Sequence, residues 1–109
     1  MQMQGWGKKE TEMQLLQISF RFEYTEAVEE ILDRHEIQDF VRYPLIEGKG
    51  LDGKHYGTQV FPGNFTVVQA QVPEAKLQPI LKDLQEFKQA KSSHQHLQAL
   101  VLPVLQRLE

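Results

Sequence analysis

The stretch EGKGLDGKHYGTQVFPG, residues 47–63, contains five of the chain's seven glycines and separates two runs that read as strands. Small domains rarely keep a long loop that has no role in binding, gating or switching. Glycine lets the backbone adopt positive φ and approach a ligand closely. Lys49, Lys54 and His55 place positive or titratable groups among the glycines. The stretch therefore predicts a binding loop.

The segments that flank this loop are rich in apolar and β-branched residues, and they predict strands over 39–46 and 64–72. At the end of the loop, Phe61-Pro-Gly-Asn64 has proline and glycine in the order that suits the centre of a type II turn. We interpret this tetrapeptide as a turn that leads into the second strand at Asn64.

Further out, one amphipathic helix is predicted on each side. The first runs from about Thr25, a candidate cap, to His35. The second ends near Lys91, and Pro79 leaves two interpretations of its start: either the helix begins close to that proline or its first turns are irregular. The apolar stripes have helical spacing and comprise Ala27, Val28, Ile31, Leu32 and His35 in the first helix, and Leu77, Ile80, Leu81, Leu84 and Phe87 in the second.

The outermost segments predict two more strands. Leu16, Ile18, Phe20 and Phe22 alternate with polar residues, which is the pattern of a half-buried strand, and Leu97–Leu105 forms the last strand, with Pro103 marking an edge. The order strand, helix, strand, strand, helix, strand predicts an α+β ferredoxin-like βαββαβ sandwich. Its four-stranded antiparallel sheet would carry two helices on one face. We expect one domain over 13–109, preceded by a flexible N-terminal arm over 1–12.

Two helices cover only one face of such a sheet, yet several strands are apolar on both faces. Val41, Tyr43 and Leu45 alternate with Phe40, Pro44 and Ile46, Phe65 and Val67 oppose Val68, Ala70 and Val72, and Leu100, Leu102 and Val104 oppose Leu97, Ala99 and Val101. A large exposed apolar face usually marks an interface. We therefore expect a homo-oligomer, with Phe65 or Val67 in a contact between subunits.

Composition narrows the class of protein. The formal net charge is −3 and no basic stripe is present, which argues against nucleic-acid binding. The chain has no cysteine, and no apolar run approaches the roughly 20 residues that span a bilayer. The first twelve residues are polar, unlike a signal peptide. We expect a cytoplasmic protein that is not embedded in a membrane.

The element order, the bare sheet face and the stretch GKGLDGKHYGT (48–58) with FPGN (61–64) together resemble the PII-like superfamily, especially its small PII-like members. The resemblance spans about Met13 to Leu105. It implies a trimer, a long projecting loop that corresponds to the T-loop, and clefts between subunits that bind nucleotides. It also implies a signalling role, with a small anionic effector and a partner protein or transporter.

One segment departs from that family. Where PII proteins carry a glycine-rich phosphate loop, this chain has AKSSHQHL (90–97), which contains no glycine. Lys91, Ser92 and Ser93 can still bond an anion there, and a polar connector is the alternative. For the glycine loop, the alternatives are ligand contact and contact with a partner protein. The candidate ligand-binding residues are Gly48, Lys49, Gly50, Gly53, Lys54, His55, Gly57, Lys91, Ser92 and Ser93.

A second functional hypothesis is a metal-responsive protein that resembles CutA, with His55, His94 or His96 as ligands. A zinc site needs three or four converging ligands, and no cysteine is available, so we expect no dedicated metal site and no cofactor. The acidic residues cluster on one helix face, and no catalytic constellation is evident. We therefore expect a binding protein and no enzymatic activity.

Overall fold

The computed structural model describes residues 13–50 and 59–108. The elements follow in the order β1 (Met13–Arg21), the 3₁₀ turn η2 (Phe22–Tyr24), α1 (Thr25–Arg34), β2 (Phe40–Gly50), β3 (Gln59–Pro73), α2 (Glu74–Ala90), the 3₁₀ turn η3 (Ser92–His94) and β4 (Gln98–Pro103). The predicted order of strands and helices is confirmed. The predicted N-terminal arm, 1–12, lies outside the described residues.

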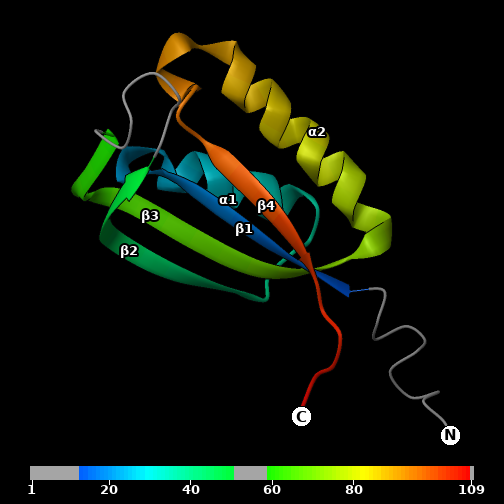
Figure 1. The fold of residues 1–109 in the computed structure, drawn as a ribbon. Helices are drawn as coiled ribbons and strands as arrows, with labels where there is room; N and C mark the ends of the chain where they lie inside the picture. Colours follow the sequence, from blue (N-terminus) through cyan, green and yellow to red (C-terminus); the bar gives the residue numbers. More distant parts are fainter. Residues whose placement is uncertain (1–12, 51–58, 109) are drawn as a thin grey trace, which may run out of the picture.

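The four strands form one sheet in the order β2-β3-β1-β4, and every neighbouring pair is antiparallel. Both helices pack on the same face of this sheet (Figure 1). The architecture is the predicted ferredoxin-like α+β sandwich. None of the helices in the described ranges is long and apolar enough to cross a membrane.

The core lies between the sheet and the two helices. The alternation in β1 buries Leu16, Ile18 and Phe20 completely, because successive side chains of a strand point to opposite faces. The same alternation in β3 buries Val68, Ala70 and Val72. The helices contribute their predicted stripes to this core, chiefly through Val28, Ile31, Leu32, Leu77, Ile80 and Leu84.

β2 and β3 extend further into the glycine stretch than predicted. Residues 47–50 pair with residues 59–62, and this two-stranded extension is called the ribbon below. The register shifts twice at its base, between Tyr43 and Ile46 and again between Ile46 and Glu47. The predicted turn over Phe61–Asn64 is wrong, because Gly63 and Asn64 form the extra residues of a bulge inside β3. A bulge accommodates such residues without ending the strand.

Both helix starts also differ from the prediction. α2 begins at Glu74, so Pro79 lies inside it, on an exposed face where the loss of one backbone hydrogen bond is tolerated. Thr25 does not cap α1, because η2 runs directly into the helix and Thr25 already has helical angles. Its hydroxyl instead donates a hydrogen bond to the Phe22 carbonyl at 2.6 Å.

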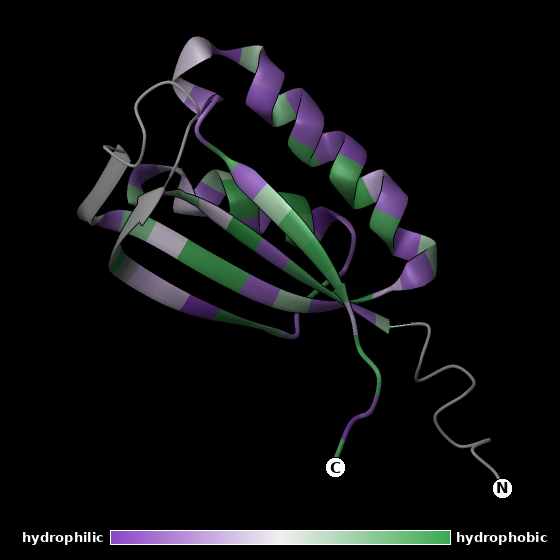
Figure 2. Cartoon of the chain, viewed as in Figure 1, coloured by the Kyte–Doolittle hydropathy of each residue, from purple (hydrophilic) through white to green (hydrophobic). Residues whose placement is uncertain are grey.

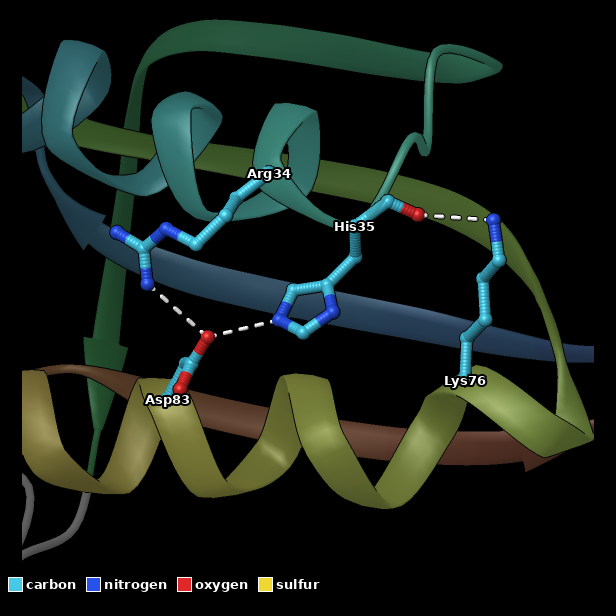
Figure 3. A network of polar contacts seen from close by, with 4 residues as sticks. All are labelled: Arg34, His35, Lys76 and Asp83. Carbon is cyan, nitrogen blue, oxygen red and sulfur yellow. Dashed lines mark hydrogen bonds and ion pairs between the residues drawn. The ribbon is translucent and has the colours of Figure 1, made fainter.

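A polar network ties the end of α1 to α2 (Figure 3). Asp83 Oδ2 accepts hydrogen bonds from His35 Nε2 at 2.7 Å and from Arg34 Nη1 at 3.0 Å. Nearer the start of α2, Lys76 donates to the His35 carbonyl at 2.9 Å. His35, predicted as a helix-end residue on the buried side, is the half-buried centre of this network.

The second face of the sheet carries no helix. Its exposed apolar residues are Val41, Tyr43, Leu100 and Leu102, with Leu15 and Val67 partly buried between them. Figure 2 shows the apolar stretch over most of β4. Glutamines interrupt this face, and Gln69 donates to Gln17 at 2.8 Å. The predicted apolar second face is present, but Phe65 is not part of its exposed surface, since only 5% of Phe65 is accessible.

Candidate functional site

One end of the sheet gathers three parts of the molecule. The end of β1 lies beside the middle of β3, where Arg21 pairs with Phe65. The base of the ribbon is at the same place, since Phe65 also pairs with Ile46. β4 starts at this end too, so the turn over residues 91–97, which connects α2 to β4, lies there as well (Figure 1).

A cavity of about 510 Å³ opens at this end, between η2, the start of α1 and β2. Thr66 on β3 is fully buried at its wall, whereas Phe22 is 49% exposed at its mouth. The lining residues are Phe22, Thr25, Phe40, Arg42, Pro44 and Thr66. Two aromatic rings and one guanidinium suit a ligand that has both a planar apolar part and a negative charge.

Arg42 supplies the positive charge of this cavity. Its Nη1 lies 3.2 Å from Glu29 Oε2 on α1, and about half of its side chain remains exposed. The ion pair restricts the guanidinium to the side of the cavity. Its other N–H donors can still bind an anion. Glu29, on α1, is partly buried beside the cavity.

The turn at 91–97 is closed by its own hydrogen bonds. Lys88 donates to the Gln95 carbonyl and, at 2.6 Å, to the Leu97 carbonyl, while the Gln95 side chain donates to the Lys88 carbonyl at 2.9 Å. His94 is buried, stacks on Phe87 with ring centroids 3.9 Å apart, and donates from Nδ1 to the Phe87 carbonyl at 2.7 Å. Side chains thus shape this turn without the help of glycine.

His96 uses both ring nitrogens in this turn. Its Nε2 accepts a hydrogen bond from the Arg21 backbone N–H at 3.0 Å, and its Nδ1 donates to the Ser93 carbonyl at 2.9 Å. Burial lowers the pKa of His96 below 6.5, and the nearby positive charge of Arg21 acts in the same direction. Glu23 and the bond to Ser93 oppose the shift.

These bonds weaken the metal hypothesis. A histidine coordinates a metal through a free ring nitrogen, and His96 has both nitrogens engaged. In the described ranges, 13–50 and 59–108, no group of three or more candidate ligands comes together. His55, the remaining histidine of that hypothesis, lies outside these ranges.

Two parts of the predicted ligand site lie at the same end of the sheet. Lys91, Ser92 and Ser93 are exposed at the turn, and the backbone of Gly48, Lys49 and Gly50 lies in the ribbon at the same end of the sheet. The other predicted ligand residues, Gly53, Lys54, His55 and Gly57, lie outside the described residues.

Sequence reasoning did not identify the residues that line the cavity. They come from three segments that are distant in the chain and meet only in the fold. One signal was present: Arg42 is the only charged residue in the run FVRYPLI, residues 40–46, where an unbroken apolar pattern would suit a strand. A single arginine in an otherwise apolar run is a candidate for an ion pair or a contact with an anion.

The fold is shared with solved structures of other proteins, although no protein-family model and no curated protein matches the chain. Among solved structures, it is similar to CPII, a nitrogen regulatory PII-like protein from Thiomonas intermedia K12, determined bound to ADP, AMP and bicarbonate. The identity is 22% and the TM-score 0.67, over 84% of this chain and 91% of CPII.

Two further solved structures share this fold. A putative PII-like signalling protein from Thermus thermophilus is 21% identical, with a TM-score of 0.61 over 84% of this chain and 86% of that protein. GlnK of B. subtilis, determined as an ATP complex, is 13% identical, with a TM-score of 0.63 over 84% of this chain and 81% of GlnK. The chain therefore has the fold of the PII-like proteins, as the resemblance in its sequence predicted.

Proposed function

We propose that this chain is a regulatory protein of the PII-like type, which binds a small anionic effector and signals through the glycine stretch at 47–63. The observation that carries the proposal is the similarity to CPII, which was determined with ADP, AMP and bicarbonate bound. An adenine nucleotide is therefore the effector to test first, together with bicarbonate.

The chemistry at one end of the sheet supports this proposal. The cavity offers aromatic rings for a base and Arg42 for an anion. Lys91, Ser92 and Ser93 are exposed on the neighbouring turn, where they can add contacts to phosphate or carboxylate oxygens. Because the cavity is open on one side, a second subunit would complete it as a cleft.

We further propose that three subunits associate through the bare face of the sheet. The exposed apolar side chains of that face, led by Leu100 at 57% and Val41 at 53%, support an interface. Closed cyclic symmetry would cover this face in every subunit and create equivalent clefts at the boundaries. Effector binding there would shift the ribbon towards a conformation that a partner protein recognises.

Titration calorimetry tests the ligand directly. The protein should be titrated with ADP, AMP, ATP, cyclic dinucleotides and bicarbonate, and each nucleotide should be repeated in the presence of bicarbonate. We expect saturable binding of an adenine nucleotide at one site per chain. The absence of heat with every compound would overturn the nucleotide-sensor function.

A further inference from the structure

His96 connects three elements through its imidazole ring. Its two nitrogens bond to backbone groups of Arg21, at the end of β1, and of Ser93, in the turn. The ring also contacts Phe65 edge-on, with centroids 5.6 Å apart, and lies 5.4 Å from the ring of Tyr24 in a tilted arrangement. One side chain in the α2–β4 turn therefore contacts β1, η2 and β3.

Each of these contacts reaches a part of the candidate site. Arg21 is followed directly by Phe22, which lines the cavity. Ser93 belongs to the exposed part of the turn, beside Lys91. Phe65 pairs with Ile46 at the base of the ribbon. The imidazole is thus the common neighbour of the cavity wall, the turn and the ribbon.

We propose that His96 is a positioning residue that fixes the turn relative to the cavity wall and the ribbon, and that it does so only as a neutral imidazole. The proposal deepens the function proposed above: its structural part is independent of that function, and its effect on ligand binding rests on it. If this relative position were lost, the groups of the turn and of the cavity could no longer contact the same effector molecule.

The donor and acceptor roles explain why charge matters. The Arg21 N–H is a donor, so Nε2 must be unprotonated, and the proton of the neutral ring must be on Nδ1, which donates to the Ser93 carbonyl. Protonation of Nε2 would place two donors face to face and break the bond to Arg21. The ring therefore has a single protonation state that satisfies both partners.

The surrounding charges set the direction of the pH effect. Arg21 on β1 and His94 on η3 disfavour a charged His96, whereas Glu23 on η2 favours it; Phe65 and Tyr24 contribute neutral rings. Burial adds to the lowering of the pKa, so the folded protein holds this proton less tightly than the unfolded chain. The stability contributed by neutral His96 is complete above pH 6.5 and declines as pH falls from there towards the folded pKa.

The first experiment needs no ligand. Nitrogen-15 NMR of the imidazole rings at pH 7.5 should show His96 as the Nδ1–H tautomer. Hydrogen-exchange protection factors, which correct for the intrinsic pH dependence of exchange, should show the Arg21 amide protected at neutral pH and at least severalfold less protected once His96 is charged. An Nε2–H tautomer, or protection of Arg21 that is unchanged through the titration of His96, would overturn the proposal.

Two variants separate positioning from simple packing. In His96→Gln, the side-chain oxygen can accept the Arg21 N–H and does not titrate, so protection should persist at pH 5.5. In His96→Phe, the ring remains but both bonds are lost, so Arg21 should be unprotected at every pH. The control is His35→Gln, at the end of α1. In this variant, protection of the Arg21 amide should depend on pH as it does in wild type. If the Arg21 amide showed the same pH dependence of protection in His96→Gln and in wild type, the role of the charge would be refuted. If a variant fails to fold, the tautomer and exchange data of the wild-type protein still test the proposal.

The second experiment adds ADP to wild type and His96→Gln at pH 7.5 and 5.5. Comparing the two proteins at the same pH cancels the titration of the nucleotide itself. We expect the wild-type affinity to fall severalfold more than that of the variant on acidification. An equal fall in both proteins would contradict the effect on binding. If ADP bound neither protein, the proposed nucleotide-binding function would be contradicted. The exchange data would still test whether His96 positions the turn.

Discussion

Arg42 and Glu29 form an ion pair beside the cavity, with the Arg42 guanidinium about half exposed. Solvent around the half-exposed Arg42 screens this pair, so its contribution to the free energy of unfolding is modest, although Glu29 Oε2 is buried. Its consequence is geometric, since it holds the Arg42 guanidinium at the side of a cavity that Phe22 also lines. The availability of Arg42 for a ligand thus depends on its neighbour Glu29, which restricts where the guanidinium lies.

Arg42→Gln should therefore weaken nucleotide binding more than it weakens folding. A hydrogen bond to a charged group contributes about 1.5–3 kcal/mol, which corresponds to roughly a 10- to 100-fold loss of affinity. Calorimetry with whichever nucleotide binds in the titrations proposed above measures the loss. Arg34→Gln, which removes an arginine at the opposite end of α1 from the cavity, is the matched control, and equal losses in both variants would contradict the assignment.

Asp83 is the second residue whose role depends on its partners. The hydrogen bond from His35, together with the charges of His35 and Arg34, lowers the pKa of Asp83 below 3.8, although burial acts in the opposite direction. Because the folded pKa is below the unfolded one, the stabilisation is complete above about pH 4 and is lost as pH falls through the folded pKa.

Asp83→Asn should consequently be less stable than wild type at pH 7, with a difference that shrinks in acid. Urea unfolding of both proteins from pH 7 down to pH 3 gives the difference at each pH. Asp33→Asn, an exposed aspartate on α1, serves as the control. A constant difference across that range would show that the ionised carboxylate has no special role.

At the scale of the element, the end of α1 is unusual. Glu36 has φ of 63° and occupies the left-handed position after the helix, where Glu36 N–H bonds to the Asp33 carbonyl and Ile37 N–H to the Leu32 carbonyl. These are the two bonds of a Schellman motif, in which glycine is the usual residue. The buried Ile37 completes it. Packing of Ile37 therefore holds a glutamate in a backbone conformation that costs energy.

Glu36→Gly should stabilise the protein by about 0.5–1 kcal/mol, since it removes the Cβ strain at the cost of some additional chain entropy. The lost contact with Lys76 is minor, because the atoms are 3.8 Å apart and the Glu36 side chain is 85% exposed. Thermal or urea unfolding measures the gain. Glu36→Ala keeps the Cβ and should show no such gain; stabilisation of equal size in both variants would exclude the strain as the cause.

At the scale of the whole molecule, the bare sheet face is the surface through which the proposed trimer would associate. Val67 lies on this face, between Ser19 and Tyr43 on the adjacent strands, and is partly buried by them. Its neighbours include some of the most exposed large apolar residues of the sheet. A second copy that covers them would bury the remaining surface of Val67.

Light scattering should give a mass of about three times the 12.7 kDa of one chain, and Val67→Asp should reduce it to that of the monomer or unfold the protein. A buried charge without a partner costs several kcal/mol, which an interface of this kind does not offset. Gln78→Glu adds the same charge on an exposed position of α2 and should leave the mass unchanged. A stable wild-type monomer would refute the interface.

The sequence by itself determined the element order, the faces of the strands and the stripes of the helices. These properties depend on how far apart the apolar residues are: two residues in a strand and three to four in a helix. Such spacing is local and is visible in the sequence, as it is for Leu16, Ile18 and Phe20 in β1. The family resemblance rested on the same order and on the glycine stretch, and the fold agrees with it.

Only the tertiary structure decided where the strands continue and which residues meet. Two register shifts let β2 and β3 continue pairing into residues 47–50 and 59–62, where the sequence predicted a loop, and past Gly63, where it predicted a turn. His96 meets the Arg21 backbone across 75 positions, and the cavity joins residues of η2, α1, β2 and β3. Such contacts depend on how elements pack together, and no periodicity within one element encodes them.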